Sequence, residues 1–270
     1  MKVANFGKCR TAVFLASALA ILATVSVCVG GGYGADLAWM NVTTVGGGVP
    51  AGTPATEYTA YITTNTTDFN GIDYETSTVY TGIVDTRISA GSPTSNYGDG
   101  SGIQVAKYEA GGHQHSLIAF TGLSNIPGTA TIKSVTLGFY VHDSAAGTRT
   151  IKLTRVLRNW VEAEATWNIY STGNNWTTAG CLSDGNDRAA SASNAGQSLG
   201  TGGSARWVTV TVTSGGILGD VKNWVDGTYS NYGWHIERDD GANDSTYDAI
   251  WSTEGDTNGL KPYLKVVYEN

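Results

Sequence analysis

The chain has 270 residues, of which 36 are glycine and only 14% are charged, and its formal net charge is -7 at pH 7. Many Gly, Ser, Thr, Asn and Asp residues stand between short apolar runs, a composition that favours strands and turns over long helices. The acidic balance argues against nucleic-acid binding, because phosphate contacts need clustered Lys and Arg.

Residues 1–32 are predicted to be a secretory signal peptide. Lys2, Lys8 and Arg10 form a positive n-region, and the apolar run TAVFLASALAILATVSVCV follows it. A run of this length could also remain as an uncleaved membrane anchor, but the small and Gly-rich residues directly after it favour cleavage. We therefore expect a secreted, extracellular protein, with association at the cell surface as an option.

Cleavage of the leader would change both the charge and the cysteine content. No acidic residue precedes Asp36, so the loss of three positive charges takes the net charge from -7 to -10. Cys9 and Cys28 lie in the leader, which leaves Cys181 alone and allows no internal disulfide. Stability is then expected from sheet packing, aided at most by a metal ion.

Residues 33–83 are predicted to be a Thr/Gly-rich linker or tail that contributes at most one strand, around STVYTGIV (77–84). Residues 84–270 are predicted to form one folded domain. Its predicted strands are 102–108, 115–120, 132–142, 149–157, 206–213, 232–238 and 262–268.

Most of these segments alternate apolar and polar residues. In 132–142, Val135, Leu137, Phe139 and Val141 share one face, while Ser134, Thr136, Tyr140 and His142 share the other. Period-two alternation in many short strands predicts an all-β fold, an antiparallel β-sandwich of the jelly-roll kind. One short helix is predicted in GGILGDVKNWVDG (215–227), where apolar residues fall at helical spacing between glycines.

Five short motifs occur in a fixed order along this domain. They are Asn-Tyr-Gly at 96–98, PGTAT at 127–131, WVEAEATWN at 160–168, a second Asn-Tyr-Gly at 231–233, and Pro262-x-Leu264. Together they resemble the DNRLRE domain, a disaggregatase-related family also classed as carbohydrate-binding module family 96. The resemblance implies an exported β-jelly-roll module, in many relatives joined to polysaccharide-degrading enzymes or cell-surface proteins. Relatives usually carry an Arg where this chain has HQHS (113–116), which argues against alginate-like ligands.

The third motif, which we call the box (residues 159–168, NWVEAEATWN), sets two carboxylates between two tryptophans. On a strand, Glu162 and Glu164 would share a face about 6.5 Å apart, near the separation used in glycoside hydrolysis. In the alternative, the box is a structural turn in which Glu162 accepts backbone N–H groups and Trp160 and Trp167 pack on the sandwich. The resemblance favours this alternative, so we predict no catalytic residues.

Sugar binding needs aromatic faces that stack on C–H groups, with polar side chains around them. Two groups of residues could supply these. The polar parity of the sheet offers Tyr140, His142, Lys152, Trp207 and His235, and the predicted loops offer Trp176, Tyr247 and Trp251.

The loops 183–188 and 238–248 concentrate Asp and Asn beside glycines. Calcium prefers six to eight oxygen ligands of this kind, and jelly-roll modules commonly hold a structural calcium ion. Calcium is therefore the one candidate cofactor, with a solvated acidic loop as the alternative. The candidate ligands are Asp239, Asp240, Asn243 and Asp244.

These observations predict a secreted, non-catalytic module that binds extracellular or cell-wall polysaccharide. One alternative is a structural or adhesive protein of the cell surface or matrix, which self-associates through its N-terminal segment or binds surface proteins. A polysaccharide-degrading enzyme is a further alternative. The sequence alone does not identify the sugar or the oligomeric state.

Overall fold

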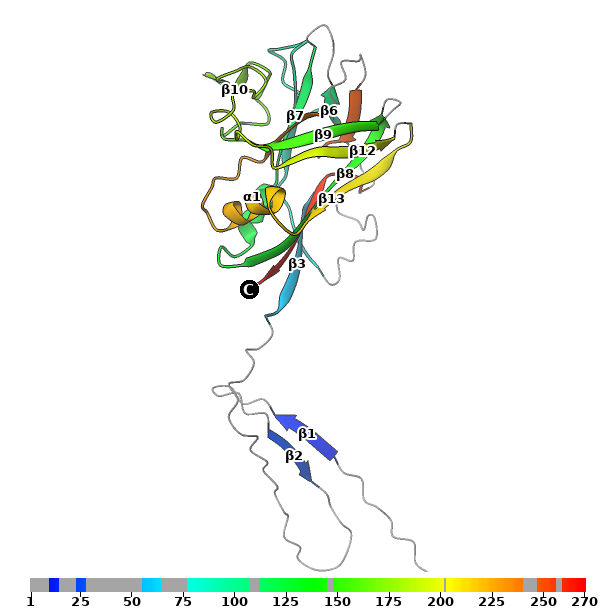
Figure 1. The fold of residues 1–270 in the computed structure, drawn as a ribbon, viewed down its shortest axis with the longest axis vertical. Coiled ribbons are helices and arrows are strands. Elements are labelled where there is room, and N and C mark those ends of the chain that lie inside the picture. Colours follow the sequence, from blue (N-terminus) through cyan, green and yellow to red (C-terminus); the bar gives the residue numbers. More distant parts are fainter. Residues whose placement is uncertain are drawn as a thin grey trace, which may run out of the picture. The chain divides into compact units, whose positions relative to one another are not determined.

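The computed structural model describes residues 10–14, 23–27, 55–64, 77–106, 112–144, 148–201, 203–239, 247–255 and 259–270 (Figure 1). The chain divides into two units, Met1–Ala55 and Thr56–Asn270. In the first unit, β1 (Arg10–Phe14) pairs with β2 (Ala23–Val27) in antiparallel fashion. The signal peptide predicted there stays a prediction. A search of the described residues finds no helix with the length and apolar character needed to cross a membrane.

The second unit is built almost entirely of strands. They are β3 (Glu57–Thr63), β4 (Thr78–Tyr80), β5 (Val84–Ser89), β6 (Gly102–Ala106), β7 (Gln114–Ala119), β8 (Thr131–Ser144), β9 (Thr148–Arg155), β10 (Ile169–Ser171), β11 (Asn174–Asn175), β12 (Asn194–Thr201), β13 (Arg206–Val212), β14 (Trp234–Arg238), β15 (Tyr247–Trp251) and β16 (Tyr263–Glu269). The helices are a 3-10 turn, η1 (Thr121–Asn125), and α1 (Gly216–Val225).

The main strands follow one another in the order β12-β9-β14-β7-β6-β15-β8-β16-β3-β4, while β13 pairs with β8 and β5 with β7. Among these described pairings only that of β3 with β4 is parallel. The structure thus confirms the predicted all-β class, an antiparallel sandwich with one short α-helix among the described residues.

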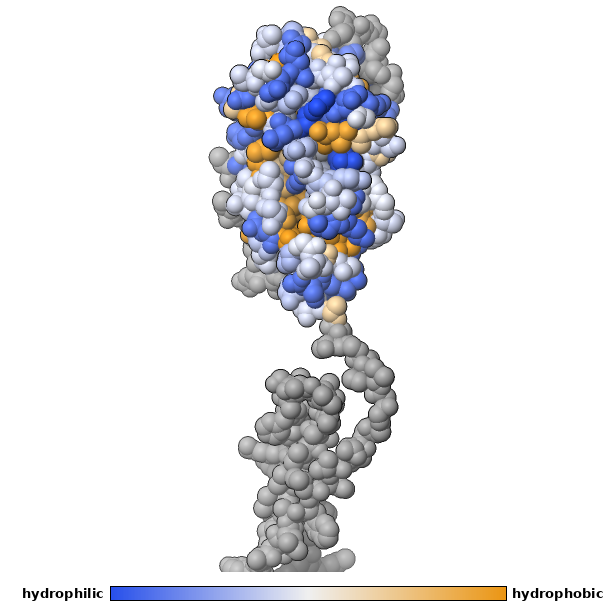
Figure 2. All heavy atoms as spheres, turned by 90° about the vertical axis from the view of Figure 1, so that its left-hand side faces the viewer, coloured by the Kyte–Doolittle hydropathy of each residue, from blue (hydrophilic) through white to orange (hydrophobic). Residues whose placement is uncertain are grey.

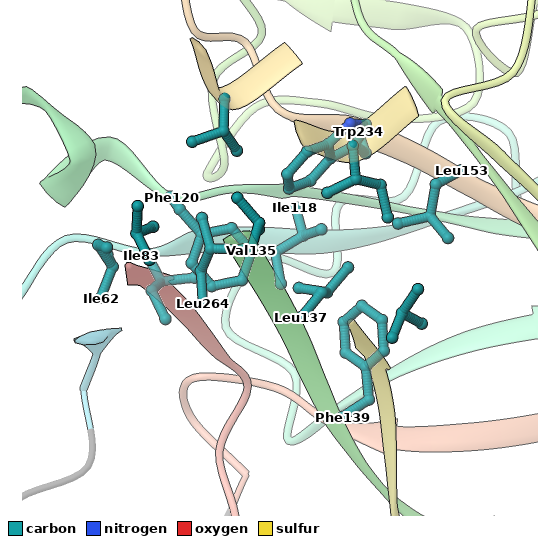
Figure 3. Packing of buried hydrophobic residues seen from close by; sticks show 14 of the residues in the cluster. Ile62, Ile83, Ile118, Phe120, Val135, Leu137, Phe139, Leu153, Trp234 and Leu264 are labelled. Carbon is teal, nitrogen blue, oxygen red and sulfur yellow. The ribbon is translucent and has the colours of Figure 1, made fainter. Parts of the chain in front are cut away.

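The main core lies between the two layers of strands. On β8, Val135, Leu137, Phe139 and Val141 are buried, as the alternation predicts, and they belong to one core cluster with Leu264 and Ile118. Figure 3 shows Val135 and Leu137 in this cluster together with Leu264 and Ile118. The apolar stripe of α1 packs on the same core, where Trp224 lies 4.6 Å from Trp234 between ring centroids. Alternate residues of each strand therefore face either this core or the outside.

Strands β3, β12 and β15 are among those that lie where the sequence predicts a linker or loops. β3 falls within residues 33–83, yet it pairs with β16 over seven positions, from Glu57↔Glu269 to Thr63↔Tyr263. β12 is glycine-rich and has Leu199 as its one buried hydrophobic residue, so it shows little alternation. β15 carries Tyr247 and Trp251, which the sequence analysis assigns to loops; this assignment is wrong, because both residues pair with β6.

The long connection from β9 to β12, residues 156–193, forms a cap over the outer face of β5 and β7. A second apolar cluster holds it there, with Ile88 and Leu117 from the strands and Trp160, Trp176 and Cys181 from the cap. The cap therefore covers one side of the sandwich with the protein's own chain.

On the face shown in Figure 2, apolar residues form separate patches among polar ones.

Candidate functional site

Six rings gather on the face of β3, β8, β13, β15 and β16 that points away from the core, and we call them the aromatic strip. They are Tyr61, Tyr140, His142, Trp207, Trp251 and Tyr263. The ring centroid of Trp207 lies 5.5 Å from that of Tyr140 and 5.3 Å from that of Tyr263. Tyr263 in turn lies 6.0 Å from Tyr61. The rings therefore form a continuous series across the strands.

Strand register explains how these residues come together. Trp207 is paired with Tyr140 on one side of β8, and Tyr263 is paired with Gly138 on the other. A Cβ atom on Gly138 would stand 2.1 Å from the Tyr263 ring, so the ring lies directly over the glycine. Gly138 thereby lets Tyr263 reach across β8 to Trp207.

The strip continues along β8 to a second ring pair. His142 stacks on Trp251 with a centroid distance of 3.8 Å and an interplanar angle of 15°. Beside them, the Tyr247 hydroxyl donates to Asp143 Oδ2 at 2.9 Å. Trp207, Tyr140, His142 and Trp251 are half-buried, whereas Tyr61 and Tyr263 are buried. The half-buried rings are the ones that a ligand could contact.

A polar pocket of about 360 Å³ lies on the other side of the core, on β7, β9 and β14. Its charged and imidazole side chains are His113, His115, Lys152, Glu237, Arg238 and Asp239. Glu237 pairs with Lys152 across the strands, and the two side chains make a 2.9 Å ion pair. Burial alone would raise the pKa of Glu237, but its neighbours His115, Lys152 and Arg188 lower it.

A buried hydrogen-bonded chain forms the floor of this pocket. Arg188 Nη1 lies 3.3 Å from His235 Nδ1, and His235 Nε2 lies 3.0 Å from His115 Nδ1. Because a guanidinium only donates, His235 accepts at Nδ1 and donates its Nε2–H to His115. Burial, which disfavours an imidazolium, lowers the pKa of His115 to about 4 and that of His235 well below its ordinary value. Both rings are therefore neutral at pH 7.

His115, His235 and Glu237 are also close enough to hold a metal ion, since their ligand atoms lie within 4.8 Å of one another. The hydrogen-bonded chain, however, already uses the imidazole lone pairs. Arg188 and Lys152 both donate to Glu237 Oε1, at 2.7 Å and 2.9 Å. These contacts favour a hydrogen-bonded floor over a metal centre.

The box is a turn, and both of its carboxylates hold backbone groups. Glu162 Oε1 accepts the Asp85 N–H and Glu164 Oε2 accepts the Thr172 N–H, each at 2.7 Å. Trp160 is buried and donates its indole N–H to Tyr232 O at 2.9 Å. Trp167 packs against His115, with ring centroids 5.0 Å apart. These contacts support the interpretation of the box as a structural turn over that of a catalytic carboxylate pair.

The two Asn-Tyr-Gly motifs brace the same region. Asn96 donates to Glu162 O and Ala165 O at 2.7 and 2.8 Å. Asn231 donates to Phe120 O at 2.9 Å. In each motif the asparagine also accepts the N–H of the following glycine, Gly98 or Gly233, at 3.1 Å. Neither glycine can carry a side chain, because a Cβ atom would clash with backbone oxygen at 2.4 Å and 1.9 Å.

A second pocket, of about 370 Å³, opens beside the box and is lined by Asn96, Asp99, Glu162 and Glu254 among others. Buried Asp85 lies next to it, with its Oδ2 accepting the Thr253 N–H at 2.9 Å. Burial raises the pKa of Asp85 to about 8, and it also raises the pKa of Glu162. Asp85, Glu162 and Glu254 form an oxygen group of the type that calcium prefers.

The structure divides the residues predicted from the sequence into separate regions. Tyr140, His142, Trp207 and Trp251 lie in the aromatic strip, with Tyr247 beside it, while Lys152 and His235 belong to the polar pocket and its floor. Trp176 and His235 are buried, so their rings offer no face to a ligand from solvent.

The predicted calcium ligands fall mostly outside the described residues, where Asp240, Asn243 and Asp244 lie. Asp239 is exposed, and its Oδ2 accepts the Gly196 N–H at 2.8 Å. Sequence reasoning also missed Tyr61, Tyr263, His113 and Glu237. For Glu237 and Tyr263, which lie on predicted strands, strand parity was an available signal that needed the register to become useful. Tyr61 and His113 lie outside the predicted strands, so no such signal was available for them.

A sequence model of carbohydrate-binding module family 96 matches residues 76–170. The match includes Tyr140, His142, Lys152 and the whole box, whereas Trp207 and Tyr263 lie beyond it. Comparison with curated proteins gives no significant match. The predicted resemblance to carbohydrate-binding module family 96 is thus confirmed for residues 76–170, whereas the resemblance to the DNRLRE domain stays a prediction.

Proposed function

We propose that the protein is a secreted, non-catalytic module that binds extracellular polysaccharide through the aromatic strip. The series of rings on the outer face of the sandwich is the observation that carries this proposal. The family match supports the ligand class, and the predicted signal peptide supports the location.

The strip has the chemistry that sugar recognition requires. Aromatic faces contact the C–H faces of a pyranose ring, and polar groups nearby bind its hydroxyls. Thr136 and Thr211 provide such groups on the same face, with hydroxyl oxygens 2.8 Å apart. From Trp207 through Tyr263 to Tyr61 the ring centroids follow one another at 5.3 Å and 6.0 Å, and the strip continues along β8 to His142 and Trp251. A series of this length suits several residues of an extended chain better than a single sugar.

Affinity electrophoresis of the whole chain against a panel of neutral and acidic polysaccharides tests this function. Retardation by at least one polysaccharide is expected, with loss of the effect in Trp207→Ala. Tyr229→Ala is a matched control, because Tyr229 is an exposed aromatic residue that contacts Arg155 rather than the strip. Unchanged mobility of the wild-type chain with every polysaccharide would reject the proposal.

A catalytic function ranks second, and one observation favours it. Glu162 lines a pocket and has a raised pKa, which are properties of a general acid. Against this, Glu162 Oε1 already holds the backbone N–H of Asp85. Release of sugar fragments from a polysaccharide, abolished in Glu162→Gln, would establish catalysis.

A further inference from the structure

We propose that the polar pocket is a second carbohydrate site, which binds one neutral sugar residue through two neighbouring hydroxyl groups. This inference goes beyond the proposed function, because the pocket lies on other strands and uses none of the rings of the strip. Only the ligand class, a sugar, is shared.

The charges that line the pocket argue for a neutral, polyhydroxyl ligand. Lys152 and Arg238 bring positive charge, while Glu237 and Asp239 bring negative charge. An anion in the pocket would face two carboxylates, and a cation would face an ammonium and a guanidinium. Sugar hydroxyls both donate and accept hydrogen bonds, so neighbouring hydroxyls can satisfy Lys152 and Asp239 together.

The polar groups are also held in place before any ligand binds. Glu237 Oε1 is fixed by Arg188 and Lys152, and Arg188 is itself fixed by Asp184 at 2.8 Å. Asp239 is anchored through its Oδ2 to the Gly196 N–H. A ligand therefore pays little for ordering these side chains.

Two further features fit a sugar. His113 Nδ1 is buried without a hydrogen-bond partner among the described residues, although His113 lines the pocket. Leu182 and Ala106 add an apolar wall that the C–H groups of a sugar can contact. The volume of about 360 Å³ falls in the lower part of the range for small-molecule sites.

The test is an NMR titration of the ¹⁵N-labelled protein with the methyl glycosides of mannose, glucose, galactose and N-acetylglucosamine. Tetrahydropyran, which has the ring without the hydroxyls, is the negative control. At least one glycoside is expected to give saturable shifts at the amides of Gly196 and Asp239, and tetrahydropyran none. Asp239→Ala and Lys152→Met should each weaken this binding about tenfold or more. Arg188 still holds Glu237 in the Lys152 variant, so the fold is expected to remain.

Two results would overturn the proposal: no saturable shift at these amides with any glycoside, or equal affinity in both pocket variants and the wild type. Trp207→Ala separates this site from the strip, since it should leave the pocket shifts unchanged. A failed pocket titration alongside Trp207-dependent retardation by polysaccharide would reject the second site alone. Pocket shifts without any retardation would reject the strip alone.

Discussion

The two outer faces of the sandwich use tryptophan in opposite ways. On the capped face, Trp160 and Trp176 are buried, and each donates its indole N–H to a backbone carbonyl, of Tyr232 and of Thr166. On the face that carries the aromatic strip, Trp207 and Trp251 are half-buried and contact other rings. A ring enclosed by its own chain braces the fold, whereas a half-buried ring can also contact a ligand. Residue type alone does not distinguish the two.

The largest expected effect is on the stability of the capped face. Trp160→Ala should lower the free energy of unfolding by about 3–5 kcal/mol, because it leaves a cavity and an unpaired carbonyl. Trp207→Ala, in the aromatic strip, should cost clearly less, because Trp207 is only half-buried. Urea denaturation followed by circular dichroism measures both variants. Equal losses would contradict the assignment of one ring to the fold and the other to the ligand.

Acid should also act on the floor of the polar pocket. The folded pKa of His115, about 4, lies below the ordinary 6.5, and that of His235 is lowered too. Between pH 6.5 and 4 the unfolded chain therefore binds protons at these histidines and the folded chain does not. The free energy of unfolding falls as the pH drops through this range. Each histidine contributes about 1.4 kcal/mol per pH unit. Denaturation of His115→Gln at several pH values should show a smaller slope, and an unchanged slope would contradict the account.

The titration of Asp85, beneath the box, should change the free energy of unfolding with pH in the opposite direction to that of the histidines. Its folded pKa is raised from 3.8 to about 8, so the folded chain keeps a proton that the unfolded chain loses. Stability should therefore fall as the pH rises through this window, by up to about 1.4 kcal/mol per unit, and offset part of the histidine effect below 6.5.

Asp85→Asn should remove this dependence between about pH 6.5 and 8, because the amide carries no charge in either state. Denaturation at several pH values measures this dependence, with exposed Asp226→Asn as the control. A chelator is present because a metal ion bound at Asp85, Glu162 and Glu254 would also change the stability. A wild-type chain that gains stability over this range would contradict a protonated Asp85.

The smallest effect is expected for Glu162→Gln. The amide oxygen can still accept the Asp85 N–H, so the free energy of unfolding should change by less than about 1 kcal/mol. Polysaccharide binding should be unchanged, as measured by affinity electrophoresis. A loss of binding would place the ligand at the box rather than at the strip.

The sequence predicts most of the fold and only part of the site. Strong alternation, as in β8, marks a strand whatever its neighbours are, and the glycine-bracketed apolar spacing marks α1. Strands such as β12 and β15 show little alternation, and they are extended because they pair with neighbouring strands. For the same reason the contact between Trp207 and Tyr263 was not predictable, since it depends on the register of both strands with β8 and on Gly138 between them.

Binding of a retarding polysaccharide to Trp207→Ala, measured by isothermal titration calorimetry, tests the central claim most directly. The wild-type chain and Tyr229→Ala should bind with equal affinity, because Tyr229 lies outside the strip. Trp207→Ala should bind about tenfold more weakly or worse while remaining folded, since stacking on the half-buried indole ring is lost. A folded Trp207→Ala variant with wild-type affinity would contradict binding at the aromatic strip.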